Sequence, residues 1–358
     1  MGTVFIDLGS RSYSIHIGHG FLEATGQIIK ETYPLITKAM LVTNSTINKL
    51  YGQKVFRSLW EAGITAVLAE IPDGEEYKAL STAEGVYDLA YTSELDRKTP
   101  IIALGGGVVG DLAGFVAATY LRGVPLVQIP TTLLAQVDSS VGGKVAVNHP
   151  RGKNIIGAFY QPAVVMADLS TLKTLDQREI RAGMSEVIKY GVISEEKFFG
   201  WLEENLERAM EQDSAAMEHI VTVSCRIKAE VVQEDETEQG RRAILNFGHT
   251  VGHAVEALTG YGVYRHGEAV AIGMTAAARI SEKIGLLDSF ERQRLERLLV
   301  RAGLPINVPP SLDRKDLIAS MRRDKKVISS RLTFILPESI GRVRMVRDLD
   351  EGLILSCL

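Results

Sequence analysis

Short apolar runs alternate with helix-like segments through the first 130 residues of the chain. The apolar runs cover residues 3–8, 12–17, 38–43, 64–71, 99–104 and 125–129, and helical spacing covers about 46–62, 77–92 and 111–121. Strands that alternate with helices form a parallel sheet that is covered on both faces. We therefore predict an α/β region with a Rossmann-like, mainly parallel sheet, whose first two strands form a hairpin.

From about residue 170 the pattern becomes helical. Helical spacing covers residues 177–207, 213–235, 249–259, 267–285 and 288–302, and two short strands follow at 331–337 and 341–346. The glycines and prolines of residues 148–162 favour neither element, so we expect this segment to connect two domains. The prediction is an α/β plus α protein, with an N-terminal domain at 1–165 and a mainly helical C-terminal domain at 166–358.

Charge and composition exclude several classes of partner. The net charge of −4 gives no reason to expect a nucleic acid. No stretch reaches about 18 uninterrupted apolar residues, so we expect no membrane span. Cys225 and Cys357 lie in no CxxC pair, and the first residues contain no basic leader before an apolar run. We therefore expect a cytoplasmic protein in which both thiols are inert.

A glycine run follows the apolar residues 99–104. Gly105, Gly107 and Gly110 fit the pattern GxGxxG, in which the backbone can approach a pyrophosphate and a helix N-terminus offers free N–H groups. No acidic residue follows at the spacing that usually binds the ribose. We expect the ribose at the ends of earlier strands, where Asn44 and residues 72–78 lie, with Glu75 as an acceptor. The alternative is that the glycines serve only the close packing of a helix on the sheet.

Three histidines fall close together in the second half of the chain: His249, His253 and His266. The first two are four residues apart, a spacing that puts both on one face of a helix. A catalytic divalent metal usually takes three protein ligands. The candidate carboxylates are Glu186, Glu256 and Glu268. Glu186 lies in an apolar helix, where an unpaired acid is unfavourable, and a salt bridge to Lys189 is the alternative explanation.

Residues 137–159 combine charged and amide groups on a glycine-rich backbone. The polar side chains are Asp138, Lys144, Arg151, Lys153 and Asn154. Lysines act as point charges on phosphate and arginines bind carboxylates bidentately, so the stretch suits an anionic polyol. Further candidates are Arg122, Arg241, Arg242 and Asn246. The alternative is an exposed basic loop without a ligand.

Six motifs together resemble the 3-dehydroquinate synthase family of sugar phosphate cyclases. They are GGGVVGDLAGFVAATYLRG, IPTTLLAQVDSSVGGKVAVN, KNIIGAFYQP, AGMSEVIKYG, LNFGHTVGHAVE and HGEAVAIGM, and the likeness runs from about residue 40 to 340. The resemblance implies a cytoplasmic homodimer with an NAD-binding α/β domain, a helical metal-binding domain and an active site between them. It also implies conversion of 3-deoxy-D-arabino-heptulosonate 7-phosphate to 3-dehydroquinate and phosphate. The expected steps are transient oxidation, phosphate elimination, re-reduction, ring opening and aldol closure.

The resemblance also implies roles for individual residues. The metal, zinc or in some members cobalt, would be held by Glu186, His249 and His266. The substrate carboxylate would meet Lys228 and Arg242. The phosphate would meet Lys144, Asn154, Asn246, His253, Lys325 or Lys326, and Arg122 of the partner subunit. Lys153 and Lys189 would bind the ring hydroxyls, with Asp138 beside the metal and the nicotinamide. The residues that would contact NAD are Asn44, Glu75, Lys78, Gly106, Gly107, Val108, Asp111, Thr131, Thr132, Lys144 and Lys153.

Three rival interpretations remain at this stage. Another sugar phosphate cyclase would act on a sugar without the carboxylate, and Arg242 with residues 142–144 argues against it. A metal- and NAD-dependent polyol dehydrogenase would accumulate NADH, whereas a cyclase would not. A non-catalytic NAD-binding protein should have lost ligands or basic residues that this chain retains.

Overall fold

The computed structural model describes residues 2–260, 262–325 and 332–358. Contacts divide the chain into two compact units. Unit 1 comprises Met1–Leu175 and Met217–Gln233, and unit 2 comprises Asp176–Ala216 and Glu234–Leu358. The helix α8 (Ser214–Glu234) therefore belongs mostly to unit 1, although it follows the first helices of unit 2 in the sequence.

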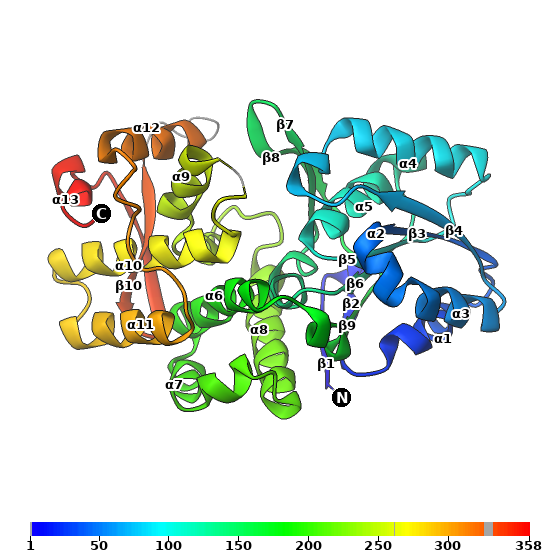
Figure 1. The fold of residues 1–358 in the computed structure, drawn as a ribbon, viewed down its shortest axis with the longest axis horizontal. Coiled ribbons are helices and arrows are strands. Elements are labelled where there is room, and N and C mark those ends of the chain that lie inside the picture. The colour runs from blue at the N-terminus through cyan, green and yellow to red at the C-terminus, as the bar shows by residue number, and fades with distance from the viewer. Residues whose placement is uncertain (1, 261, 326–331) are drawn as a thin grey trace. The chain divides into compact units, whose positions relative to one another are not determined.

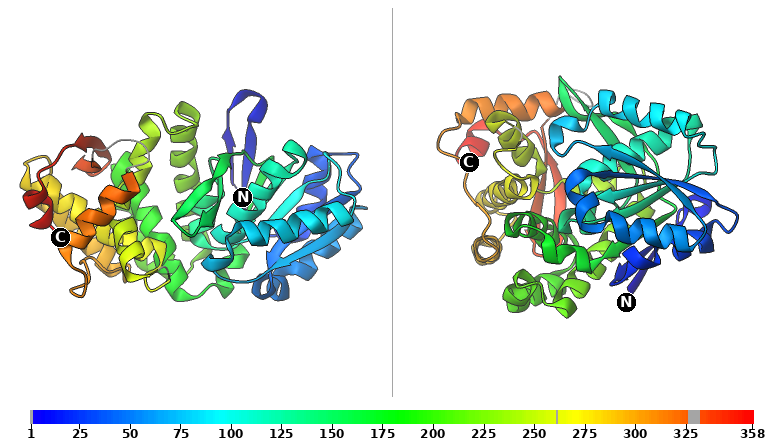
Figure 2. Two further views of the ribbon diagram at one scale, coloured as in Figure 1. Left: turned by 90° about the horizontal axis from the view of Figure 1, so that it is seen from above. Right: turned by 45° about the vertical axis from the view of Figure 1, so that its right-hand side comes forward.

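Unit 1 is built on a seven-stranded sheet (Figure 1). In spatial order its strands are β1 (Gly2–Ile6), β2 (Tyr13–Gly18), β9 (Val164–Asp168), β6 (Leu126–Pro130), β5 (Ile101–Gly105), β3 (Lys38–Asn44) and β4 (Thr65–Ile71). The predicted hairpin of β1 and β2 is antiparallel and extends from the sheet in Figure 2, and the other strand pairs of this sheet are parallel. The predicted mainly parallel α/β sheet is confirmed.

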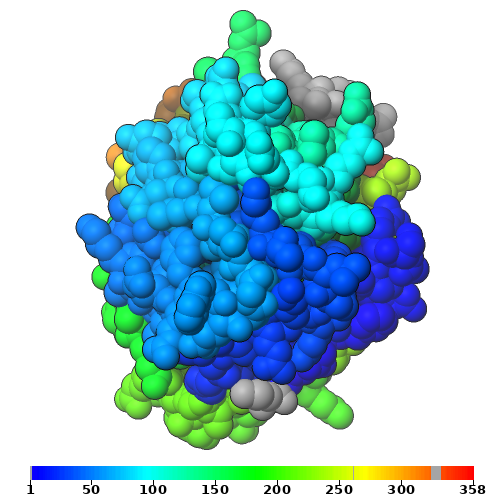
Figure 3. All heavy atoms as spheres, turned by 90° about the vertical axis from the view of Figure 1, so that its right-hand side faces the viewer, coloured from blue at the N-terminus to red at the C-terminus, as the bar shows by residue number. Residues whose placement is uncertain are grey.

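Helices cover both faces of this sheet. On one face lie α1 (Phe21–Thr32) and α3 (Gln53–Glu61), and on the other lie α4 (Leu80–Thr92) and α5 (Gly107–Thr119). Met40 and Val42 of β3 pack toward α4 and α5, whereas Ala39 and Leu41 pack toward α1 and α3. A strand that is buried on both faces needs apolar residues at consecutive positions, which explains the unbroken apolar run. Figure 3 shows the side of unit 1 whose surface comes mainly from the first hundred residues.

The segment 148–162 does not connect two domains, so that prediction was wrong. Its first part completes β7 (Lys144–His149), which pairs antiparallel with β8 (Gly152–Phe159) inside unit 1. The first proline of the segment lies in the tight turn between the strands, and its first glycine begins β8. Gly157 lies within β8, where an added Cβ would meet the Val145 carbonyl oxygen at 2.3 Å. These residues shape a hairpin rather than interrupt an element.

Two further differences concern short elements next to the sheet. β9 has no counterpart among the predicted strands, although it lies between β2 and β6. Helix α5 begins at Gly107, four residues before the predicted start at 111. The glycine run therefore supplies the first turn of the helix itself.

Unit 2 is mainly helical, as predicted. Its helices are α6 (Gln177–Ser194), α7 (Glu196–Met210), α9 (His249–Thr259), α10 (His266–Lys283), α11 (Ser289–Arg301), α12 (Arg314–Lys325) and α13 (Glu351–Leu355). The predicted helical stretch 177–207 is two helices, α6 and α7, separated at Glu195. The late hairpin consists of β10 (Thr333–Ser339) and β11 (Arg342–Arg347), and residue 331 of the predicted strand lies outside the described residues. Across the described ranges, no helix has the length and apolar character needed to cross a membrane.

Candidate metal and nucleotide sites

Helix α10 packs closely against α6 and α9 because glycines stand at the contacts. A Cβ added to Gly267 would lie 1.9 Å from the Ala182 carbonyl oxygen of α6. A Cβ added to Gly273 would lie 1.8 Å from the Gly248 carbonyl oxygen, immediately before α9. No side chain larger than glycine fits at such distances. The two glycines thus allow three helices to bring their polar residues together.

Glu186, His249 and His266 meet where these helices converge. Glu186 lies within α6, and the two histidines are the first residues of α9 and α10. One potential ligand atom from each residue lies within 4.8 Å of the other two. The His249 and His266 ring centroids are 5.2 Å apart. One carboxylate and two imidazoles at this spacing match the ligand types of a divalent metal site.

Both imidazoles are oriented by acceptors at Nδ1. His249 Nδ1 lies 3.1 Å from the Phe247 carbonyl oxygen, and His266 Nδ1 lies 3.2 Å from Glu256 Oε2. A ring that donates through Nδ1 keeps its Nε2 lone pair for a metal. Burial, and then the charge of Lys189 and the neighbouring histidines, holds the pKa of His249 well below its ordinary value. His249 is therefore neutral near pH 7, as a metal ligand must be.

The environment of Glu186 also suits a metal. Its side chain is fully buried, and neither carboxylate oxygen accepts a hydrogen bond from the residues that the structure describes. Lys189 forms the ion pair with Glu186 that the sequence suggested as an alternative, and His266 Nε2 lies 3.7 Å from Glu186 Oε1. The ammonium of Lys189 stabilises this buried carboxylate at Oε2, while Oε1 faces the His266 ring and is the oxygen placed for a metal. The donor set thus fits a divalent ion.

The other two candidate carboxylates have different surroundings. Glu268 accepts from Arg178 Nε at 2.6 Å and Nη2 at 2.8 Å, and from the Arg265 backbone N–H at 2.9 Å. It joins neither candidate metal group among the described residues. Glu256 forms a second group with His253 and His266. The structure therefore leaves Glu186 and Glu256 as carboxylates beside the histidines and assigns Glu268 to helix capping.

The predicted anion-binding residues of unit 2 lie on the same elements or next to them. Lys189 is on α6, and Arg242 and Asn246 belong to the short turn Arg241–Asn246 before α9. Arg242 is buried and donates from Nη1 to the Glu236 carbonyl oxygen, and Asn246 donates to Glu238 Oε1 at 2.6 Å. Lys325 ends α12, and Lys326 lies outside the described residues.

The predicted NAD residues lie at the carboxyl ends of four neighbouring parallel strands. Asn44 ends β3, Glu75 and Lys78 follow β4, Gly106 to Asp111 follow β5, and Thr131 and Thr132 follow β6. Since these strands are parallel, all four segments reach the same edge of the sheet, where α/β folds bind nucleotides.

The glycine run packs closely and also opens a helix at this edge. A Cβ on Gly105 would lie 2.7 Å from a Val109 methyl group, and a Cβ on Gly106 would lie 3.1 Å from a Thr132 methyl group. Close packing of α5 on the sheet is therefore one reason for the glycines at these positions. Because α5 begins at Gly107, its free N–H groups and the positive end of its dipole also lie at the carboxyl end of β5.

A buried lysine links two of these segments. Lys78 Nζ lies 2.9 Å from Asp111 Oδ2 and 3.4 Å from Glu75 Oε1, and its side chain is 4% exposed. Burial alone would lower the pKa of Lys78, but the charges of Asp111 and Glu75 outweigh burial and raise it. Burial works in the opposite direction on Glu75, but Lys78, Lys153 and a hydrogen bond from Asn148 hold its pKa below the ordinary value. Lys78 and Glu75 are thus both ionised at neutral pH.

The remaining predicted residues of unit 1 lie at three places. Lys144, Lys153 and Asn154 belong to the β7–β8 hairpin. Asp138 lies in the π-helical turn Ala135–Ser139, and Lys228 of α8 donates to its Oδ1 at 2.6 Å and its carbonyl oxygen at 2.7 Å. Arg122 follows α5 with a left-handed backbone, at φ +67°. Sequence reasoning missed Asn148, which bonds to Glu75 and carries no recognisable pattern.

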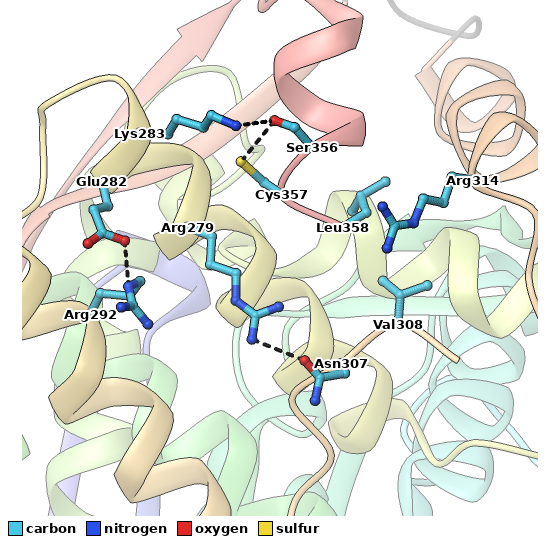
Figure 4. A pocket seen from close by; sticks show the side chains of 10 residues that line it. All are labelled: Arg279, Glu282, Lys283, Arg292, Asn307, Val308, Arg314, Ser356, Cys357 and Leu358. Carbon is cyan, nitrogen blue, oxygen red and sulfur yellow. Dashed lines mark hydrogen bonds and ion pairs between the residues drawn. The ribbon is translucent and has the colours of Figure 1, made fainter. Parts of the chain in front are cut away.

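A separate pocket of about 720 Å³ lies elsewhere in unit 2 (Figure 4). Its lining includes Arg279, Lys283, Arg292 and Arg314. Each of these cations already has a protein partner, such as Glu296 for Arg279 and Glu282 for Arg292. Among the residues that the structure describes, none of the predicted catalytic ones lines this pocket, so its size does not mark the site of chemistry.

Family models match most of the chain. The model for the N-terminal part of 3-dehydroquinate synthase matches residues 68–182, and the model for its C-terminal part matches residues 183–327. A curated 3-dehydroquinate synthase of Desulforamulus reducens is 55% identical over 358 residues, which is 100% of this chain and 99% of that protein. One from Pelotomaculum thermopropionicum is 55% identical, over 100% of this chain and 96% of that protein.

Solved structures of sugar phosphate cyclases share the fold. A 2-deoxy-scyllo-inosose synthase complexed with carbaglucose-6-phosphate, NAD+ and Co2+ has a TM-score of 0.90 and 28% identity, over 99% of this chain and 98% of that one. A 2-epi-5-epi-valiolone synthase of Streptomyces hygroscopicus with NAD+ and Zn2+ has a TM-score of 0.89 and 26% identity, over 98% and 97%. An iron-containing alcohol dehydrogenase of Thermotoga maritima, at 17% identity and a TM-score of 0.66 over 96% of each chain, shares the fold alone.

The two family models together span residues 68–327, and the named relatives match the whole chain at more than half of its positions. This chain belongs to the 3-dehydroquinate synthase family.

Proposed function

We propose that the residues gathered at the two sites carry out the reaction of this family as the resemblance implies. The chain is a lyase that uses NAD and a divalent metal, and its reaction yields 3-dehydroquinate and phosphate from 3-deoxy-D-arabino-heptulosonate 7-phosphate. The residue assignment rests on one observation. Potential ligand atoms of Glu186, His249 and His266 lie close together in a chain that belongs to this family. We assign NAD binding to the N-terminal domain, and metal binding to the helical domain.

Glu186, His249 and His266 would hold the metal, either Zn2+ or Co2+ as in the related cyclases. When bound, such an ion stabilises negative charge that develops on a substrate oxygen. The Phe247 carbonyl oxygen and Glu256 lie at Nδ1 of the two imidazoles and would leave each Nε2 for the ion. Lys189 lies beside Glu186, and we assign it to a ring hydroxyl of the substrate.

NAD would lie along the carboxyl ends of β3 to β6, and when bound it would supply a reversible hydride acceptor for the reaction. The first N–H groups of α5 suit the pyrophosphate. Glu75 is ionised and suits a ribose hydroxyl. Lys78 forms ion pairs with both Glu75 and Asp111 and so keeps the two carboxylates near each other. The remaining contacts proposed for NAD are Asn44, Gly106, Gly107, Val108, Thr131 and Thr132.

The substrate carries two anionic groups, and the chain offers cations for each. We assign the carboxylate to Lys228 and Arg242, and Lys228 is held in place by Asp138. We assign the phosphate to Lys144, Asn154, Asn246, His253, Lys325 or Lys326, and Arg122 of the partner subunit. The phosphate of the substrate is itself a base, so residues that hold it firmly also position it to take a proton during its elimination. This assignment requires a homodimer, and we propose a cytoplasmic one.

The test is a phosphate-release assay on purified protein with the seven-carbon keto-acid phosphate, NAD+ and zinc, with the NADH absorbance recorded at the same time. We expect phosphate release over many turnovers without accumulation of NADH, and a chelator should abolish it. NADH accumulation without phosphate would favour a polyol dehydrogenase. Turnover only with a sugar phosphate that lacks the carboxylate would favour another cyclase, the second candidate that the neighbouring structures support.

A further inference from the structure

The end of β7 is attached to the segment that follows β4. The Asn148 backbone N–H donates to the Lys78 carbonyl oxygen at 2.6 Å, and Ala79 and Asn148 form an isolated parallel bridge. Two stretches that are about 70 residues apart in the sequence therefore share a backbone connection. One stretch carries Glu75 and Lys78, and the other leads into the hairpin turn.

The side chain of Asn148 joins the same two stretches a second time. Its Nδ2 donates to Glu75 Oε1 at 2.8 Å and to the Glu75 carbonyl oxygen at 3.2 Å. Its Oδ1 accepts from the Asn154 backbone N–H at 2.9 Å. A neutral amide is the side-chain group that offers two donors and an acceptor without adding charge. Asn148 thus uses both ends of its amide, one on each stretch.

The position of Asn154 depends on this contact. Asn154 has φ +57°, a left-handed conformation that residues with a Cβ adopt rarely. Its side chain is exposed, as are most of its neighbours in β8, so few buried contacts fix this part of the hairpin. The bond from the Asn154 N–H to Asn148 Oδ1 is therefore a main restraint on its backbone.

The charges around Glu75 favour the same arrangement. Lys78 Nζ lies 3.4 Å and Lys153 Nζ lies 3.8 Å from Glu75 Oε1, the oxygen that also accepts from Asn148. One carboxylate oxygen thus contacts a residue assigned to NAD, a residue assigned to the substrate, and the amide that orders the hairpin. A movement of the Glu75 side chain would therefore change its ion pair with Lys153. It would also change the position of Asn154, through the hydrogen bonds of Asn148 to both residues.

We propose that Asn148 is a positioning residue that couples nucleotide binding at Glu75 and Lys78 to the placement of the substrate-binding residues Lys153 and Asn154. NAD fixes Glu75, Glu75 fixes the amide of Asn148, and the amide fixes the backbone of Asn154. This inference rests on the proposed function, because that function supplies the roles at each end. NAD should consequently strengthen substrate binding through Asn148.

The test measures this coupling by calorimetry. The ligands are NAD+ and a phosphonate analogue of the substrate. The analogue carries carbon in place of the bridging oxygen and hydrogen in place of the hydroxyl that NAD oxidises, so that neither elimination nor oxidation can occur. The coupling factor is the ratio of the analogue dissociation constants without and with saturating NAD+. We expect a factor above 10 for the unmodified protein and a fall toward one in Asn148→Ala, since bonds to a charged group and to an ordered N–H are lost.

Two further variants distinguish coupling from general damage. Ile155→Ala truncates an exposed side chain of the same hairpin, next to Asn154, and should keep the factor of the unmodified protein. Asn148→Asp keeps the acceptor for Asn154 but sets a second carboxylate against Glu75, between Lys78 and Lys153. Its coupling should be lost at pH 8 and partly recovered as the pH is lowered and one of the two carboxyl groups is protonated. A purely structural role would give no such recovery.

The possible outcomes distinguish a failure of the role proposed for Asn148 from a failure of the proposed function. Coupling that persists in Asn148→Ala, or a factor of one in the unmodified protein, would overturn the role of Asn148 while leaving the NAD and substrate sites intact. Failure of the unmodified protein to bind NAD+ or the analogue at all would instead overturn the proposed function.

Discussion

Glu256 should control metal affinity without being a ligand. Its Oε2 lies 3.2 Å from His266 Nδ1, and its side chain is 5% exposed. The carboxylate fixes the tautomer and the direction of the ring, and its charge makes Nε2 a stronger donor to a metal. Glu256→Ala removes both effects, whereas Glu256→Gln keeps an acceptor at the same place and removes only the charge.

Outer carboxylates of this kind typically change metal affinity by about 10–100-fold, which is about 1.4–2.7 kcal/mol. We expect Glu256→Ala to weaken zinc binding within that range and Glu256→Gln to weaken it less. Glu186→Gln changes the proposed ligand itself and should weaken binding more than either. Glu268→Gln is the matched control, since Glu268 is engaged by Arg178 and should leave zinc affinity unchanged.

The assay is competition for Zn2+ between purified apoprotein and a chromophoric chelator, so the result does not depend on turnover. Thermal unfolding of each apoprotein checks that the variants are folded. A Glu256→Ala protein with unchanged zinc affinity would refute the role assigned to Glu256. A Glu256→Gln protein that loses more affinity than Glu186→Gln would make Glu256 the ligand.

Three other predictions concern packing, charge and thiol reactivity. Gly273→Ala should lower the free energy of unfolding in urea by about 3 kcal/mol, because its Cβ would lie 1.8 Å from a backbone oxygen. Gly200→Ala is the control, since its Cβ would lie in open space on α7, and it should raise the free energy of unfolding by about 0.5–1 kcal/mol. Equal changes in the free energy of unfolding for the two variants would contradict the role of close packing at Gly273. Lys78→Met should lower the free energy of unfolding by about 3 kcal/mol, because it leaves Asp111 without its ion pair. A Lys78→Met protein of unchanged stability would show that the pair is dispensable. Burial raises the pKa of Cys225 to about 12, so roughly one molecule in 10⁴ carries the thiolate at pH 8. A thiol reagent followed by mass spectrometry should label Cys225 only after denaturation, and rapid labelling of the native protein would disagree.

The sequence predicted the fold where patterns are long and repeated. Apolar runs alternating with helical spacing are enough to predict a parallel sheet, and β3 to β6 lie where expected. The pattern was less informative at short elements. β9 is a short buried strand of four apolar residues and Asp168. The β7–β8 hairpin contains glycines and a proline, which are also common in linkers. Only pairing with distant strands distinguishes such segments from loops.

The candidate site also contains residues that the sequence pattern predicts and residues that it does not. The spacing of the histidines predicted a metal group, but three carboxylates were open because spacing says nothing about which direction each side chain takes. The structure turns Glu268 toward Arg178 and Glu256 toward His266 Nδ1. Asn148 could not be predicted, because a neutral amide in a glycine-rich segment has no charge or spacing pattern, and its partners are far away in the sequence.

The most direct test of the account is the position of the metal. Crystals grown with Zn2+ and NAD+ should give an anomalous difference peak, in data collected above but not below the zinc absorption edge. We expect the peak within about 2.0–2.2 Å of a Glu186 carboxylate oxygen and of Nε2 of both His249 and His266. A peak held instead by His253, Glu256 and His266 would contradict the assignment, and with it the roles proposed for the residues around Glu186.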